Sequence, residues 1–158
     1  ILFTFYNVVN LPTLQPDYEW QNIPNRTVGY RLEQGQIRRD SSTDVSWKMA
    51  GGGLISTPKD LANFCGALMD ETLINEREKR ILWSRQITNK RKLTNYGLGF
   101  TIARRTVRFN VGHNGSQEKT KARLTLYPYD NVCIVIMSNT NSTKPNTFIK
   151  AITPIVLN

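Results

Sequence analysis

The stretch SWKMAGGGLIST, residues 46–57, is the part of the chain that says most about the fold. Three consecutive glycines precede a short apolar run, and Ser56 and Thr57 then supply the side chains that favour a helix N-cap. Pro58 suits the first helical position, and Asp60 stands three residues after Thr57. Apolar residues follow with helical spacing at Leu61, Phe64, Cys65 and Leu68. The stretch therefore predicts a helix that begins after Thr57 and buries one face.

Downstream of this helix the chain predicts a second helix and then a sheet. The second helix is expected from Asn75 to about Trp83. Residues 96–102 and 107–111 alternate between apolar and polar or small side chains, which predicts two strands with a turn at residues 104–106. A further pair of strands is expected at residues 122–127 and 132–138, joined by Pro128, Tyr129, Asp130 and Asn131.

The last strand and the end of the chain complete the expected layers. The run VCIVIM, residues 132–137, is apolar throughout and is expected at the centre of the sheet. Residues 146–156 predict a final helix with Phe148, Ile149, Ile152 and Ile155 on one side. The predicted fold class is therefore α+β, an antiparallel sheet flanked by helices.

The region before the glycines lacks a clear period. Residues 10–50 are rich in Pro, Asn, Gln, Ser and Asp, and Pro12, Pro16 and Pro24 interrupt any long regular element. We expect a long ordered loop here, with one short strand near residues 27–32.

Composition narrows the classes of function. The chain has 158 residues with 21 Lys and Arg against 12 Asp and Glu, a net charge of +9. An anionic partner would suit that charge, but the cations occur in small groups without interleaved aromatic residues, so nucleic-acid binding is not expected.

Cys65 and Cys133 form no C-x-x-C motif, and both lie in apolar surroundings, which predicts buried free thiols.

Several segments occur together in one order: IPNR at 23–26, GY at 29–30, SWKMAGGGLIST, YGLGF at 96–100, GHNG at 112–115, and the run from 124 to 139. Over roughly residues 23–139 they resemble the serine β-lactamase and penicillin-binding protein family, and are most similar to its mitochondrial serine β-lactamase-like branch. The resemblance implies the C-terminal part of a β-lactamase/transpeptidase-like fold over residues 23–158, after a divergent segment at 1–22. It also implies a mitochondrial location, with the cytoplasm as the alternative, and no cofactor or metal.

The family's site is lined by three motifs: S-x-x-K, a Tyr or Ser motif ending in Asn, and K-T-G or H-T-G on an edge strand. By resemblance, the third motif corresponds to His113, Asn114 and Gly115, which places the second oxyanion donor at the backbone amide of Ser116. His113 would hydrogen-bond or exchange a proton near neutral pH, while Asn114 and Gly115 would contact the substrate. Asn114 replaces the usual Thr, and residues 116–121 are charged where the family has glycine and small apolar residues. An exposed histidine entering a turn remains the alternative for His113.

Other motif matches are interpreted structurally. Ser56 and Lys59 match S-x-x-K, but Ser56 and Thr57 are expected to cap a helix. Ser116 and Lys119 also match, although residues three apart on a strand point to opposite faces. The Y-x-N match at residues 129–131 is expected to be a hairpin turn.

Two functions follow from these residues. The first is the C-terminal segment of a serine hydrolase that acts on a small-molecule or peptide substrate through an acyl-enzyme. Because the S-x-x-K nucleophile is absent, we expect this segment to be inactive alone. The alternative is a non-catalytic interaction or membrane-scaffolding module whose partner is an anionic membrane surface or a second copy of the chain.

Overall fold

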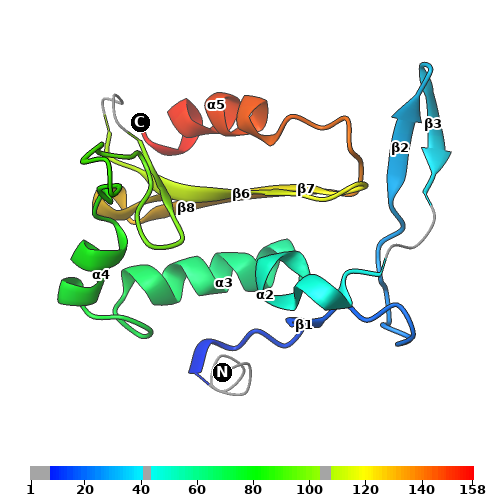
Figure 1. Ribbon diagram of the computed structural model, residues 1–158, viewed down its shortest axis with the longest axis horizontal. Helices are drawn as coiled ribbons and strands as arrows, with labels where there is room; N and C mark the ends of the chain where they lie inside the picture. Colours follow the sequence, from blue (N-terminus) through cyan, green and yellow to red (C-terminus); the bar gives the residue numbers. More distant parts are fainter. Residues whose placement is uncertain (1–7, 41–43, 104–107) are drawn as a thin grey trace.

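The protein has three layers, with a four-stranded antiparallel sheet between helices (Figure 1). The computed structural model describes residues 8–40, 44–103 and 108–158. Helix α5 (Pro145–Val156) covers one face of the sheet, and α3 (Pro58–Met69) covers the other. The strands, in spatial order, are β5 (Thr101–Ile102), β6 (Val111–Ser116), β7 (Lys121–Tyr127) and β8 (Val132–Ser138). This architecture confirms the predicted α+β class.

Both helices predicted after the glycine-rich stretch are present. The hydroxyl of Thr57 accepts a hydrogen bond from the amide of Asp60 at 3.3 Å, and Pro58 occupies the first turn of α3. Asp60 is buried, and its carboxylate accepts hydrogen bonds from the amide and hydroxyl of Thr13, both at 2.7 Å. Helix α4 (Glu76–Leu82) begins with a reciprocal capping box between Asn75 and Glu78.

Strand alternation places two of the three core clusters of the described residues on opposite faces of the sheet. Val111, Leu124 and Leu126 point toward α3, where they pack with Cys65 and Leu68. On the opposite face, Ile149 of α5 and the following Leu157 form a cluster with Tyr127 and Ile134 of the sheet. The predicted apolar face of this helix is only partly correct. Ile149 and Ile152 pack on the sheet, whereas Phe148 and Ile155 are 50% and 74% exposed.

The strand boundaries differ from the prediction at three places. The strand expected at 107–111 begins at Val111 and continues to Ser116, so it contains the H-x-G motif instead of preceding it. The strand expected at 96–102 is reduced to Thr101–Ile102, because Gly97 donates to the carbonyl of Phe100 in a turn. Gly99 has a φ of 82° in this turn, which disfavours a residue with a Cβ. The turn expected at 104–106 lies outside the described residues.

The predictions for the last two strands are correct in position, but β8 is not central. Within the described residues, β7 lies inside the sheet and β8 at its edge. The VCIVIM run is apolar because helices cover both of its faces. The short helix η2 (Pro128–Asp130) joins β7 to β8, and Asn131 takes a left-handed conformation with a φ of 52°. The Y-x-N match is therefore a turn, as predicted.

The region before the glycines contains more regular structure than expected. Strand β2 (Tyr30–Glu33) pairs with β3 (Gln36–Arg39) in a hairpin that projects from the body of the molecule (Figure 1). Gln34 and Gly35 both have positive φ, which suits the tight turn between the two strands. The remaining elements of this region are β1 (Gln15–Pro16), η1 (Ser46–Lys48), α2 (Met49–Gly52) and β4 (Leu54–Ile55). Among all the helices of the described residues, none combines the length and apolar character needed to cross a membrane.

The prediction of free thiols is wrong. Cys65 of α3 and Cys133 of β8 form a disulfide, with their Cα atoms 6.3 Å apart. Cys65 faces the sheet, and Cys133 lies on the face of β8 that α3 covers. The two residues are 68 positions apart, so only the packing of α3 on β8 brings them together.

We predict that reduction lowers the free energy of unfolding by about 4 kcal/mol, because a bond across this separation restricts the unfolded chain. Urea denaturation with and without reductant measures the difference. A thiol reagent added to the urea-unfolded, unreduced protein should find no reactive cysteine. Two reactive thiols per chain would contradict the disulfide.

Candidate functional site

The H-x-G residues lie on an edge of the sheet that no described strand covers. Strand β5 pairs with β6 only at Val111 and Gly112, so residues 113–116 pair with β7 alone. The carbonyl of Asn110 accepts from Ala103 on the β5 side, and the amide of Gln117 donates to Thr120 on the β7 side. The backbone N–H and C=O groups of successive residues in a strand point alternately to its two sides. Residues 114 and 116 therefore point to the same side as Asn110, and beyond Gly112 no described strand covers that side.

Glycine is required where the edge begins. A Cβ on Gly112 would lie 2.2 Å from the carbonyl oxygen of Leu124 on β7. The hydroxyl of Thr101 donates to the carbonyl of Gly112 at 2.7 Å and closes the short pairing with β5. Glycine is less strictly required at position 115, since the atom nearest to an added Cβ would be the Cβ of Ala122 at 3.2 Å.

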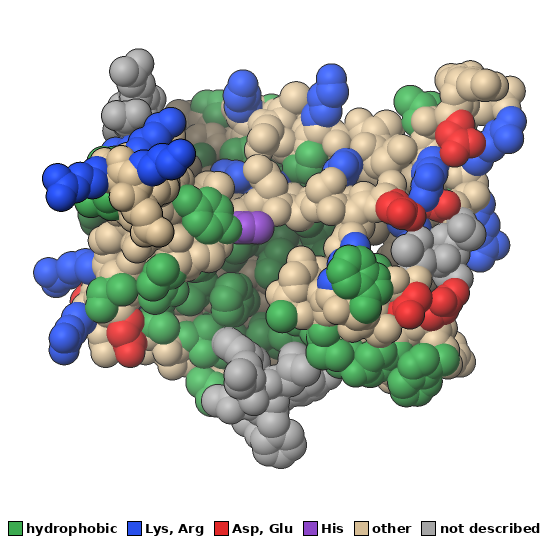
Figure 2. All heavy atoms as spheres, in the orientation of Figure 1, with side chains coloured by type: hydrophobic (Ala, Val, Ile, Leu, Met, Phe, Trp, Pro, Cys, Tyr) green, Lys and Arg blue, Asp and Glu red, His purple; other side chains and the backbone are tan. Residues whose placement is uncertain are grey.

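His113 lies at the surface and pairs with Tyr96. Its Nε2 is 2.7 Å from the Tyr96 hydroxyl, and the two rings meet edge to face with centroids 6.0 Å apart. Figure 2 shows this histidine, the only one in the chain, beside a hollow with hydrophobic side chains at its floor. Tyr96, which the sequence placed on a strand, instead contacts the candidate site with its hydroxyl group.

Asn114 points to the opposite face of β6, where it meets Arg123. Arg123 Nη1 donates to Asn114 Oδ1 at 3.1 Å, and Arg123 Nε donates to the hydroxyl of Thr125 at 2.9 Å. Partial burial lowers the pKa of Arg123. No carboxylate of the described residues forms an ion pair with this guanidinium. Sequence reasoning missed Arg123, although its nine-residue distance from Asn114 fits two facing positions of a hairpin.

The turn after β6 is attached to the glycine-rich stretch. Gln117 accepts a hydrogen bond from Lys48 Nζ at 2.6 Å and donates to the carbonyl of Gly52 at 3.2 Å. A Cβ on Gly52 would lie 2.2 Å from Gln117 Nε2, so the close approach depends on glycine. Trp47 is 78% exposed and therefore does not pack into the core, while the Lys48 ammonium lies 5.1 Å from its ring centre.

Glu118 gives the same turn a second attachment. Arg31 of β2 forms ion pairs with Glu118 at 2.8 Å and with Asp40 at 2.5 Å. The pKa of Arg31 is raised, chiefly by its hydrogen bond to Asp40. The charged residues that depart from the family pattern thus connect the end of β6 to the β2–β3 hairpin.

In neither S-x-x-K match does the serine side chain form a hydrogen bond with the lysine of the same motif. Ser56 Oγ lies 3.5 Å from the Thr13 hydroxyl, while Thr57 caps α3. Ser116 accepts a hydrogen bond from Lys121 Nζ at 2.6 Å across the hairpin. The aliphatic part of Lys119 lies instead beside Gly29, where an added Cβ would be 2.3 Å from Lys119 Cδ.

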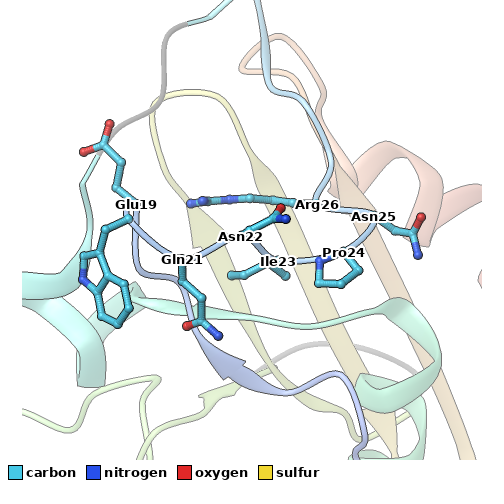
Figure 3. A pocket seen from close by; sticks show the side chains of 8 residues that line it. Glu19, Gln21, Asn22, Ile23, Pro24, Asn25 and Arg26 are labelled. Carbon is cyan, nitrogen blue, oxygen red and sulfur yellow. The ribbon is translucent and has the colours of Figure 1, made fainter.

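Two cavities lie away from the β6 edge. One, of about 550 Å³, is lined by the continuous loop of residues 19–26 (Figure 3). Arg26 in this loop forms an ion pair with Asp17 at 2.5 Å. The other, of about 480 Å³, lies between α4 and η2. Within the described residues, no group of three or more His, Cys, Asp or Glu side chains could hold a metal ion.

Residues 17–152 match the family described as Beta-lactamase. The chain belongs to this family. Among solved structures, it resembles the penicillin-binding protein from Bacillus halodurans, with a TM-score of 0.78 and 16% identity over 98% of this chain and 48% of that one. It also resembles the octameric penicillin-binding protein homologue from Pyrococcus abyssi, with a TM-score of 0.76 and 15% identity over 98% of this chain and 36% of that one.

A third similar structure is the D-stereospecific amidohydrolase from Streptomyces sp., with a TM-score of 0.74 and 18% identity over 92% of this chain and 45% of that one. These identities support the shared fold alone. The chain spans less than half the length of each of the three structures. No curated protein sequence matches it.

We predict that Gly112→Ala lowers the melting temperature by at least about 2 °C, because its Cβ must displace a backbone carbonyl at a cost of about 1–3 kcal/mol. Gly51→Ala is the matched control, since Gly51 lies in α2 with open space around it. Thermal unfolding of the two variants should show a loss only for Gly112→Ala. Equal losses would contradict the close contact between β6 and β7.

Proposed function

We propose that this chain forms the sheet wall of a serine acyl-transfer site that cleaves an amide or ester bond in a small-molecule or peptide substrate. The Beta-lactamase family match makes a serine hydrolase the expected type of enzyme. The observation that carries the proposal is the uncovered edge of β6. The backbone amides of Asn114 and Ser116, which follow His113 on this strand, both face outward there. A substrate placed along this edge would meet backbone donors that are already oriented.

The amide of Ser116 is suited to stabilise an oxyanion. Acyl transfer develops negative charge on the substrate carbonyl oxygen, and donors that are already in place stabilise that charge most effectively. Ser116 is held by its pairing with Lys121 on β7 and by the attachments of the following turn. In the proposal, the second donor belongs to the nucleophile itself.

Residues on both faces of β6 extend the proposed site. His113, hydrogen-bonded to Tyr96, would form a hydrogen bond with the reacting groups. Arg123, oriented by Asn114, would bind a substrate carboxylate, because a guanidinium without an acidic partner favours such a ligand. Gly115 would leave room for the substrate beside the strand.

The attacking serine and its basic partner would come from polypeptide outside residues 1–158. Two observations support this part of the proposal. The similar solved structures are more than twice as long as the region matched, and neither S-x-x-K match here joins its serine to its own lysine. The hydrogen bond from Lys121 to Ser116 must be tested as an alternative source of the nucleophile, because an adjacent base can activate a serine hydroxyl.

We predict that benzylpenicillin, a carboxylate-bearing β-lactam, perturbs the backbone amide signal of Ser116 in a nitrogen–proton correlation spectrum. Arg123→Gln should weaken this binding about tenfold, in line with the loss of a charge-assisted hydrogen bond. Arg77→Gln removes an equal charge from the exposed face of α4 and should leave binding unchanged. An unmoved Ser116 signal, or equal weakening by both variants, would refute the proposed substrate edge.

We predict further that the purified chain turns over neither nitrocefin nor p-nitrophenyl acetate. Loss of the nucleophile costs on the order of 10⁶ in kcat in a well-studied serine protease. Spectrophotometric assays of the chain and of its Ser56→Ala and Ser116→Ala variants provide the check. Turnover that Ser116→Ala abolishes would instead assign the nucleophile to Ser116, with Lys121 as its base.

A second candidate function is a non-catalytic module that binds anionic membranes. Ile87 and Leu93 pair in an antiparallel bridge and are 67% and 46% exposed, and the turn between them carries Lys90, Arg91 and Lys92. Apolar side chains beside a group of cations suit a negatively charged lipid surface. Salt-sensitive binding to anionic vesicles without turnover would separate this function from the first.

The mitochondrial location implied by resemblance remains part of the proposal and is tested by localising the protein in cells.

A further inference from the structure

A second concave site lies at the opposite end of β7 from Ser116. The cavity of about 480 Å³ is bounded by α4 on one side and by η2, the β7–β8 connection, on the other. The hairpin turn after β6 lies at the other end of these strands, so the cavity shares no residue with the proposed acyl-transfer edge. An inference about this cavity therefore stands independently of the proposed function.

Aromatic rings form much of the wall. Phe109 and Tyr129 lie with ring centroids 5.5 Å apart at an angle of 44°. Tyr129 is 86% exposed, so its ring is accessible to a ligand. Trp83 forms another part of the wall and contacts Phe100 edge to face from the core side. Such flat apolar surfaces favour another aromatic ring, in a stacked or edge-to-face arrangement.

Two buried hydrogen-bond donors of the wall lack a full set of acceptors. The indole nitrogen of Trp83 is buried without a partner. Lys79 is only 4% exposed, and its ammonium donates to the carbonyl of Met69 at 2.6 Å and to Glu76 Oε1 at 2.8 Å. An ammonium has three protons, so one remains for a further acceptor. Since a buried donor without an acceptor destabilises the protein, a ligand that supplies an acceptor here would be favoured.

The charges of the cavity favour an anion. The pKa of Glu76 is lowered, chiefly by its hydrogen bond with Lys79, so the two residues form a charged pair with no net charge at neutral pH. Arg80 also lines the cavity, and it forms no ion pair with a carboxylate of the described residues. The residues that line the cavity therefore carry a net charge of +1, from Lys79 and Arg80 against Glu76.

We propose that this cavity binds a small aromatic carboxylate. The ring of the ligand lies against Phe109 and Tyr129, and its carboxylate faces Arg80 and the remaining proton of the Lys79 ammonium. The aromatic wall supplies affinity for the ring, whereas the guanidinium and the buried donors select for the anion.

Phenylacetate is a suitable probe, and the indole signal of Trp83 is the direct readout. The chain has three tryptophans, so a nitrogen–proton spectrum shows three indole signals. Trp20→Phe and Trp47→Phe identify two of them, and both positions tolerate substitution because they are 80% and 78% exposed. The third signal then belongs to Trp83 without any change to the cavity.

We expect phenylacetate to shift the Trp83 signal with a dissociation constant of about 1 mM, while the signals of Trp20 and Trp47 stay in place. Phenylacetamide, which keeps the ring but lacks the charge, should bind about tenfold more weakly, as should phenylacetate to Arg80→Gln. Arg77→Gln, three positions earlier on the same helix and outside the cavity, should bind phenylacetate like the unchanged chain.

Three results would overturn the proposal. The first is a Trp83 signal that does not move at ten times the expected dissociation constant. The second is equal binding of phenylacetate and phenylacetamide, which would remove the selection for an anion. The third is equal weakening by Arg80→Gln and Arg77→Gln, which would reduce the effect to long-range charge.

Discussion

Burial of β7 between two helices is the constraint on which the rest of the structure depends. Leu126 of this strand is fully buried against α3 with Val111, and Tyr127 is buried on the opposite face near α5. Each large apolar side chain buried in this way contributes about 1.5–3 kcal/mol relative to its exposed state. The disulfide between α3 and β8 fixes the same layers covalently. Strand β6 is thereby held rigidly at β7, which is a requirement for any site built from backbone groups.

The uncovered edge of β6 follows from two local features. The turn at residues 97–100 limits β5 to two residues, so the pairing with β6 ends at Gly112. Beyond that point the attachments of Gln117 and Glu118 hold the end of the strand without covering it. A sheet edge in proteins is usually protected by charge, by a bulge or by another element. Here the outward-facing amides remain available next to His113, in agreement with the proposed acyl-transfer role.

The two proposed sites use the charge of the chain differently. At the β6 edge, Arg123 is partly buried and oriented by neutral side chains, so solvent would screen its interaction with an anion less than at a fully exposed arginine. At the α4 cavity, the pair of Lys79 and Glu76 is internally neutral, and the excess charge comes from Arg80 at the rim. Under the two proposals, at least two of the cations that make up the net charge of +9 bind specific anions.

The sequence by itself determined the elements whose signals are local. The capping residues of α3 and α4, the alternation in β7 and β8, and the turn at residues 128–131 all lie within a few positions of the structure that they specify. The family resemblance likewise depended on short ordered segments, and the Beta-lactamase match confirmed the family but not the mitochondrial branch. The resemblance put His113 on an edge strand, but the apolar alternation ended the strand before it, at residue 111, whereas the structure places His113 within β6.

Only the tertiary structure decided the features that join distant parts of the chain. The disulfide between Cys65 and Cys133, the pairing of His113 with Tyr96, and the attachment of Gln117 to Gly52 connect residues 68, 17 and 65 positions apart. No periodicity or motif encodes such contacts, because they arise from how helices pack across a sheet and not from the local backbone. For the same reason β8 reads as a central strand in the sequence but lies at an edge of the described sheet. An apolar run reports that both faces are covered, whereas the hydrogen-bonding edge of a strand leaves no trace in side-chain hydrophobicity.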